Sequence, residues 1–394
     1  MRCLHQLNLE RKLMNLQPFK DCLAHTNSIY ISNDDGPIRP CCWFDTGIKA
    51  QTVADYREQL AKLDIETNCK HCIKQEAGGA TWSHRKLFNN PKEFVLGVCF
   101  DNICNLKCVT CSPVHSSQLI NEWDELKLYG NGPDKRYYTR ISKQAPEKIE
   151  FIQDVLNHSE FDILRLEIFG GEPLINPNVF KFIDWITEQP FASNTILSVT
   201  SNSTIYSEKI SEYASKFKNV SLQLSIDGIE DTFEYLRYGT VYEDTCKTTK
   251  AYYDLLEKHP NYTLGMNYTL SWMNALHFPE FFNWAQTNFP KMHTHLTKLE
   301  GPYHYSVNIL SLEQREKIVE YTMSLAHDPI TPQFEKLLDL YKQSMLFKNN
   351  DSFDRIMFAS GIQSLKNIDG LRQEDHTKVL TPVLEFINDT IRKS

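Results

Sequence analysis

The stretch CFDNICNLKCVTCSP, residues 99–113, places Cys104, Cys108 and Cys111 with three and then two residues between them. It follows directly on the apolar run FVLGV, which has the composition of a buried strand. Disulfide bonds, a zinc site, an iron–sulfur cluster and simple packing are the possible reasons for so many thiols in so little sequence. The composition and the order of elements along the chain narrow these possibilities.

The 394-residue chain has the composition of a folded, acidic protein. Hydrophobic residues make up 41% and charged residues 23%, which predicts a packed core. The formal net charge of −8 gives no general attraction to phosphate backbones, so it speaks against a nucleic-acid partner. No apolar run has the length of a signal peptide or a membrane span, so we expect a cytoplasmic protein without membrane contact.

The cysteines are unevenly placed. Of the eleven, only Cys246 lies beyond residue 111. In a reducing compartment such clustering favours metal or redox chemistry over disulfide bonds. Cys99 lies within the apolar run itself, so we expect it to be a buried packing residue.

From about residue 93, short apolar runs alternate with helical patterns. Strands are predicted at 93–100, 162–170, 195–201, 220–226, 263–271 and, more weakly, 292–299. Helical patterns fall at 146–158, 176–189, 207–218 and 242–259. This alternation predicts an α/β fold with a parallel sheet and crossover helices. Five or six such units are too few for a closed eight-fold barrel, so we expect an open, partial barrel or a doubly wound sheet.

Three regions differ in composition and in the pattern of apolar residues, and we expect them to be three domains. Residues 1–90 are polar and cysteine-rich, 91–310 carry the strand–helix alternation, and 311–394 read as a helical extension. The extension opens with Ser311 and Gln314, which have the spacing of a capping box. The polar interval 122–147 is predicted to be a long loop or an insertion.

The three-cysteine loop suits an iron–sulfur cluster with an open coordination position. It follows the first predicted strand, and ligands of parallel sheets and barrels gather at the carboxyl ends of strands. Three thiolates can hold three irons of a cubane and leave the fourth iron free for another ligand. Structural zinc takes four protein ligands, for which Cys99 would have to be the fourth.

The loop resembles the defining motif of the radical S-adenosylmethionine (SAM) enzymes, C-x3-C-x2-C after the first strand of a partial (β/α)6 barrel. FGGEP, TSNS, LSIDG and an arginine in EYLRYG then follow in the family's order. The resemblance implies that SAM is bound by Gly170, Gly171, Glu172, Ser201, Asn202, Ser225 and Arg237. In one departure, Thr110 precedes the third cysteine, where the family often has an aromatic residue.

A second set of cysteines lies before the barrel. By spacing alone, Cys22, Cys41, Cys69 and Cys72 fit a zinc ribbon with a turn at NDDG. The pattern C-x13-G-x4-C also resembles half of the auxiliary-cluster motif of twitch and SPASM domains. That resemblance implies that these four cysteines bind an auxiliary [4Fe-4S] cluster, with Cys42 as an alternative to Cys41.

The layout resembles the radical SAM proteins of bacteriophages and bacteria that carry their twitch domain at the N-terminus. Glu76, Ser83 and Arg85 follow the second cysteine pair, and we expect them to be surface residues rather than neighbours of a cluster.

The resemblance implies reductive cleavage of SAM at a [4Fe-4S] cluster to a 5′-deoxyadenosyl radical. That radical would abstract hydrogen from a peptide, a protein or a small metabolite. The implied partners are SAM, the substrate and a reductant such as flavodoxin or ferredoxin. Two alternatives stay open at this point: a zinc-binding scaffold protein, and a nucleic-acid- or nucleotide-modifying enzyme.

Overall fold

The computed structural model describes residues 22–33, 37–77, 83–130, 132–325, 332–346 and 352–393. Gly36, which belongs to the C-x13-G-x4-C spacing, lies outside the described residues.

Within the described residues, eight strands form one sheet in the order β2-β1-β3-β4-β5-β6-β7-β8. Every neighbouring pair is parallel except β1 and β2, which form an antiparallel hairpin. The strands are β1 (Ser28–Ile31), β2 (Ile38–Arg39), β3 (Glu93–Cys99), β4 (Ile163–Phe169), β5 (Thr195–Ser201), β6 (Asn219–Ser225), β7 (Tyr262–Leu270) and β8 (His293–Lys298).

The six strands β3 to β8 confirm the strand predictions, each bound falling within one residue of the predicted one. The outer face of the sheet is apolar: Leu166, Leu197 and Val220 lie in register on neighbouring strands and are fully buried. The inner face is polar in its middle, where Ser198, Ser221 and residues like them are partly exposed. The inner face is therefore available to ligands, whereas the outer face forms the core.

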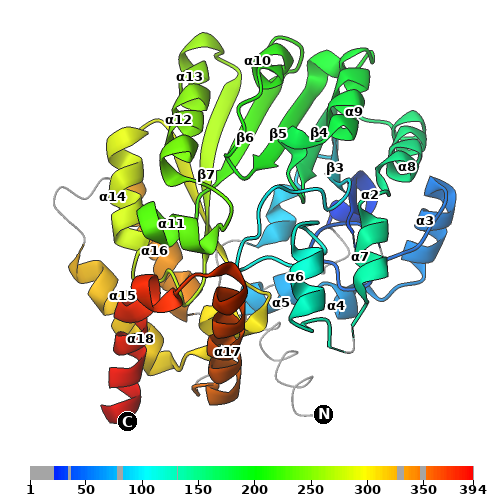
Figure 1. Ribbon diagram of the computed structural model, residues 1–394. Helices are drawn as coiled ribbons and strands as arrows, with labels where there is room; N and C mark the ends of the chain where they lie inside the picture. Colours follow the sequence, from blue (N-terminus) through cyan, green and yellow to red (C-terminus); the bar gives the residue numbers. More distant parts are fainter. Residues whose placement is uncertain are drawn as a thin grey trace.

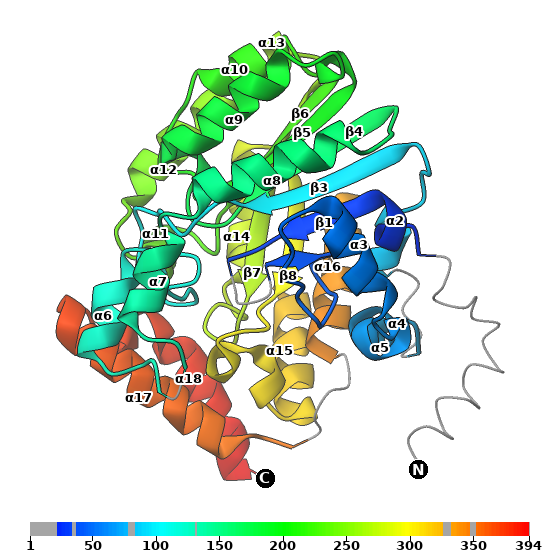
Figure 2. The ribbon, with the colours of Figure 1, turned by 90° about the vertical axis from the view of Figure 1, so that its right-hand side faces the viewer.

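Helices cover the outer face of the curved sheet, as Figure 2 shows. They are α8 (Ala145–Asn157), α9 (Pro177–Thr187), α10 (Lys209–Ala214), α12 (Tyr242–Tyr253), α13 (Leu255–Lys258) and α14 (Phe278–Asn288). Because β8 and β2 end the sheet without pairing to each other, the barrel is open, as predicted. The α/β fold with a partial barrel and a helical C-terminal part is confirmed.

The N-terminal region contributes its hairpin to this same sheet, because β1 pairs in parallel with β3. The short helices α2 (Ala24–Asn27), α3 (Val53–Ala61), α4 (Ile65–Asn68) and α5 (Lys70–Ala77) surround the hairpin (Figures 1 and 2). The division of the chain into three domains at residues 90 and 310 stays a prediction.

The interval 122–147, predicted to be a long loop or an insertion, contains the end of one helix, α6 (Leu119–Glu125), and the whole of another, α7 (Lys135–Ile141). The Asp134 carboxylate caps α7 by accepting from the backbone N–H of Arg136 and Tyr137. Ile120, Tyr138 and Ile141 pack in a small core of their own. Each helix is only seven residues long, too short for its apolar spacing to stand out in the sequence.

The C-terminal part is helical as predicted, with α15 (Leu312–Ser324), α16 (Pro332–Leu346), α17 (Arg355–Arg372) and α18 (His376–Lys393). The capping box is present: the Gln314 N–H donates to Ser311 Oγ at 3.2 Å, and the Ser311 N–H donates to Gln314 Oε1 at 2.8 Å. None of the helices in the described part of the chain combines the length and the hydropathy that a bilayer crossing requires.

Candidate functional site

The three-cysteine loop begins where β3 ends. Its backbone is hydrogen-bonded to the end of α11 (Glu230–Leu236) and to the chain that follows that helix. The Lys107 N–H donates to the Tyr238 carbonyl at 2.9 Å, and the Val109 N–H donates to the Leu236 carbonyl at 2.8 Å. The Ser116 hydroxyl donates to the Leu106 carbonyl at 2.6 Å. These bonds fold the loop so that Cys104, Cys108 and Cys111 line one cavity of about 590 Å³.

The same cavity collects most of the residues predicted to bind SAM, from the carboxyl ends of β4, β5 and β6 and from the end of α11. Those that line it are Gly170, Gly171, Ser201, Asn202, Ser225 and Arg237. The sequence analysis did not single out several others, namely His115, Trp123, Thr200, Asp227 and Thr269. Thr200 and Asp227 stand inside the quoted motifs TSNS and LSIDG, so their positions carried a signal. No motif in the sequence pointed to His115 or Trp123.

The glycine pair after β4 is required by both backbone conformation and space. Gly170 and Gly171 have φ values of +78° and +56°, a region that side chains disfavour. A Cβ on Gly170 would lie 1.9 Å from Cys99 Sγ, and one on Gly171 would lie 2.4 Å from the Ile103 carbonyl oxygen. Cys99 is fully buried, as predicted for a packing residue, and it fills the space beneath Gly170.

Glu172 turns inward and does not line the cavity. Its carboxylate accepts from Ser201 Oγ at 3.0 Å, from the Leu174 N–H at 3.0 Å and from the Asn202 N–H at 2.6 Å. Burial raises the pKa of Glu172, and these hydrogen bonds act in the opposite direction. The carboxylate therefore organises the end of β5, while its contact with the SAM amino group stays a prediction.

Arg237 is buried at the cavity wall and already holds a partner. Its Nε and one terminal nitrogen each lie 2.9 Å from Asp227 Oδ2, and its other terminal nitrogen lies 4.0 Å from Cys108 Sγ. Asp227 Oδ1 accepts from the Thr269 N–H at 2.7 Å, which ties the pair to β7. Asp227 thus aims the guanidinium, and the nitrogen near Cys108 is the one turned toward the cysteine loop.

The donor set of this cavity fits a cluster with one open iron. Burial raises the pKa of all three thiols, that of Cys108 to about 11. The thiols are therefore protonated near neutral pH until a metal displaces their protons. Three sulfurs beside a cavity large enough for a small molecule match three ligated irons and one exchangeable position.

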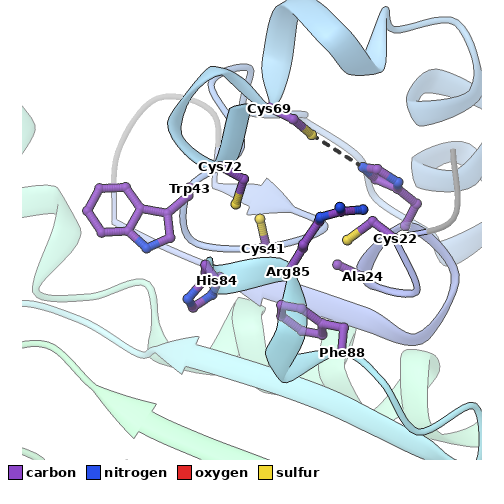
Figure 3. Close-up of a pocket in the computed structure, with 10 residues that line it drawn as sticks. Cys22, Ala24, Cys41, Trp43, Cys69, Cys72, His84, Arg85 and Phe88 are labelled. Atoms are coloured by element: carbon purple, nitrogen blue, oxygen red, sulfur yellow. Dashed lines mark hydrogen bonds between the residues drawn. The ribbon is translucent and has the colours of Figure 1, made fainter. Parts of the chain in front are cut away.

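The second set of cysteines also converges. Cys22, Cys41, Cys69 and Cys72 surround one narrow pocket between the hairpin and α5, as Figure 3 shows. Cys69 Sγ lies 3.8 Å from His25 Nε2, the contact dashed in Figure 3. Burial raises the pKa of Cys41 and Cys69 to about 12. Four sulfurs around one space fit either a fully ligated cubane or a zinc ion.

Cys41 and Cys42 have different surroundings. Cys41 lines the pocket, whereas Cys42 does not, and its Sγ lies 3.3 Å from His84 Nε2. The turn after β2 separates the two side chains, since neighbouring residues in extended or turn structure face different directions.

The expectation that Glu76, Ser83 and Arg85 are surface residues is wrong. Glu76 and Ser83 are buried, and the Ser83 hydroxyl donates to Glu76 Oε1. Arg85 donates to both carboxylate oxygens, at 2.6 Å from Nε and 2.9 Å from a terminal nitrogen. Arg85 also lines the cysteine pocket, so the carboxylate holds a cation against it. The intervening residues 78–82 lie outside the described part of the chain.

Known proteins give the following similarities. No protein-family model matches the chain. Radical SAM cyclopropyl synthase TigE of Paramaledivibacter caminithermalis is 26% identical over 172 residues, which are 43% of this chain and 34% of TigE. The chain thus spans about a third of the length of the curated relative it matches.

Solved structures show partial likenesses. Native anSMEcpe with bound AdoMet has a TM-score of 0.42 at 16% identity, covering 64% of this chain and 63% of that one. Streptococcus suis SuiB bound to precursor peptide SuiA has a TM-score of 0.37 at 16% identity, covering 71% and 53%.

Proposed function

We propose that this chain, a radical SAM protein by its cysteine loop, its open parallel sheet and its similarity to TigE, cleaves SAM reductively to start radical chemistry on a substrate. The observation that carries the proposal is the shared cavity. Three loop cysteines, the glycine pair after β4, Ser225 and Arg237 all line it, although they come from the ends of β3, β4, β6 and α11.

The residues of the chain have distinct roles in this proposal. Cys104, Cys108 and Cys111 would hold a [4Fe-4S] cluster, and Arg237, aimed by Asp227, would accept the SAM carboxylate. When bound, cluster and SAM supply one-electron cleavage to methionine and a 5′-deoxyadenosyl radical. The protein positions the reactants and keeps water away from them.

We also propose an auxiliary [4Fe-4S] cluster at Cys22, Cys41, Cys69 and Cys72. Its support is that the four sulfurs share one pocket next to the sheet that carries the SAM cavity. The Glu76–Arg85 pair places one guanidinium at its wall, where Arg85 acts to lower the pKa of the Cys22 thiol and Glu76 acts to raise it.

The substrate is proposed to be a peptide, a protein or a small metabolite, as the twitch and SPASM resemblance suggests. The inner face of the sheet below the cavity supports a polar substrate, because it presents Ser198, Ser221, Gln223 and Asn267. A flavodoxin- or ferredoxin-type reductant and a cytoplasmic location complete the proposal.

The test is the release of 5′-deoxyadenosine from SAM by anaerobically reconstituted, dithionite-reduced protein. The Cys104→Ala/Cys108→Ala/Cys111→Ala variant should release none. Cys246→Ala, which changes a partly buried cysteine on α12, should release as much as the unchanged chain. Release by the triple variant, or a colourless protein that holds only zinc, would overturn the proposal.

A further inference from the structure

The last residue of α17 reaches α6, the helix that follows the cysteine loop, from the far end of the chain. Arg372 Nε donates to Glu122 Oε2 at 2.9 Å, and a terminal nitrogen donates to Oε1 at 2.6 Å. Both side chains are almost fully buried, at 3% and 1% exposed. Glu122 stands on α6, which follows the cysteine loop, and both views place α6 beside α17 (Figures 1 and 2).

Arg372 also contacts Tyr238, in the segment whose carbonyls accept hydrogen bonds from the cysteine loop. Its guanidinium lies 4.6 Å from the centre of the Tyr238 ring. The carbonyls of Tyr238 and Leu236 accept the two loop hydrogen bonds on either side of Cys108. Arg372 therefore packs against both anchors of the loop: the helix that follows it and the backbone beneath it.

A second buried contact one turn earlier fixes the position of α17. Asp369 accepts from Tyr235 Oη at 3.1 Å, which joins α17 to α11. The same carboxylate accepts from the His376 N–H at 2.6 Å, which joins it to the start of α18. The end of α17 is thus held on three sides and cannot shift without disturbing α6 or α11.

We propose that Arg372 is a positioning residue of the SAM-binding cluster: its two-pronged pair with Glu122 and its packing against Tyr238 hold the cysteine loop in place. The proposal rests on the proposed function for the presence of that cluster. It gives the C-terminal helices a role in a site whose ligands all precede residue 240.

Two variants test the pairing of Arg372 with Glu122. Arg372→Lys keeps the cation but loses the two-pronged pair. Arg372→Gln with Glu122→Gln removes both charges and keeps side chains that can hydrogen-bond to each other. Arg315→Gln is the matched control, because Arg315 is a fully buried arginine on α15 that donates to the Met345 carbonyl at 2.8 Å, away from the loop.

The measurement is alkylation of the thiols in the cluster-free full chain, followed by mass spectrometry, in which Arg315→Gln should label like the unchanged chain. Arg372→Lys should speed labelling of Cys104, Cys108 and Cys111 relative to Cys246, and the double Gln variant should label like the unchanged chain. Equal labelling rates for Arg372→Lys and the unchanged chain would overturn the geometric role. Should no cluster form even in the unchanged chain, the proposed function fails, whereas this labelling still decides whether Arg372 holds the loop.

Discussion

At the scale of single residues, the site depends on two glycines whose neighbours leave no room for a Cβ atom. Gly171 faces the Ile103 carbonyl and Gly170 faces Cys99, so the strand end and the cysteine loop nearly touch. The close approach is what allows the backbone after β4 and the loop thiols to share one cavity.

Gly171→Ala should destabilise the protein by about 1–3 kcal/mol, because alanine at positive φ is strained and its methyl group meets a backbone oxygen. Gly370→Ala is the control: no atom lies near its Cβ position, and it stands in α17. That change should stabilise the protein by about 0.5–1 kcal/mol. Chemical denaturation measures both, and equal stability of the two variants would contradict the steric account.

Arg237→Ala should weaken SAM binding by about 1.5–3 kcal/mol, the usual contribution of a hydrogen bond to a charged group. Asp227→Ala should also weaken it, since Arg237 would lose the partner that aims it. Calorimetric titration of SAM into anaerobically reconstituted protein provides the measurement. Iron content should stay the same in both variants, and an unaltered affinity would remove Arg237 from the SAM site.

At the scale of elements, the β1–β2 hairpin decides which of two adjacent cysteines enters the pocket. The hairpin pairs with β3, so its position relative to the sheet is set by register. Cys41 comes two residues after β2 and turns into the pocket with the cysteines before α2 and around the start of α5. Cys42 turns toward His84 instead.

Cys41→Ser should therefore abolish the auxiliary cluster, whereas Cys42→Ser should retain it. Reconstituted wild-type protein is expected to hold about eight irons per chain, by the stoichiometry of two cubanes. Cys41→Ser should hold about half of that, and Cys42→Ser about the full amount. Iron and sulfide analysis is the measurement, and the reverse result would make Cys42 the ligand.

At the scale of the whole molecule, one sheet carries both cysteine sites. The order β2-β1-β3-β4 places the auxiliary pocket at one edge and the SAM cavity at the carboxyl ends of the strands. If the auxiliary cluster transfers electrons or binds substrate, changing Cys69 and Cys72 together to Ala should leave 5′-deoxyadenosine release intact. If the pocket is a structural staple, the variant should be unstable instead, since a metal-built region loses folding energy with its metal.

Cluster loss should depend on pH across both sites. Burial raises the pKa of the cysteine thiols, to about 11 for Cys108 and about 12 for Cys41 and Cys69. Protons therefore compete with iron below those values, and the competition strengthens as pH falls. A chelator should bleach the reconstituted protein faster at mildly acidic than at mildly alkaline pH. The visible absorbance follows the loss, and a rate that does not depend on pH would contradict this account.

Local spacing in the sequence was enough to predict six strands, the cysteine loop, the glycine pair and the capping box at Ser311. Each depends on residues a few positions apart, where periodicity and backbone preference act directly. Short helices such as α6 escaped this reading, because seven residues show too little periodicity.

Which groups face each other could be learned from the folded chain alone. It turned Glu172 away from the cavity, paired Asp227 with Arg237, buried Glu76 against Arg85 and chose Cys41 over Cys42 for the pocket. It also joined Arg372 to Glu122 across 250 residues. The physical reason is that a buried polar group needs a partner, and strand register and helix packing, rather than chain neighbours, determine which partner it meets.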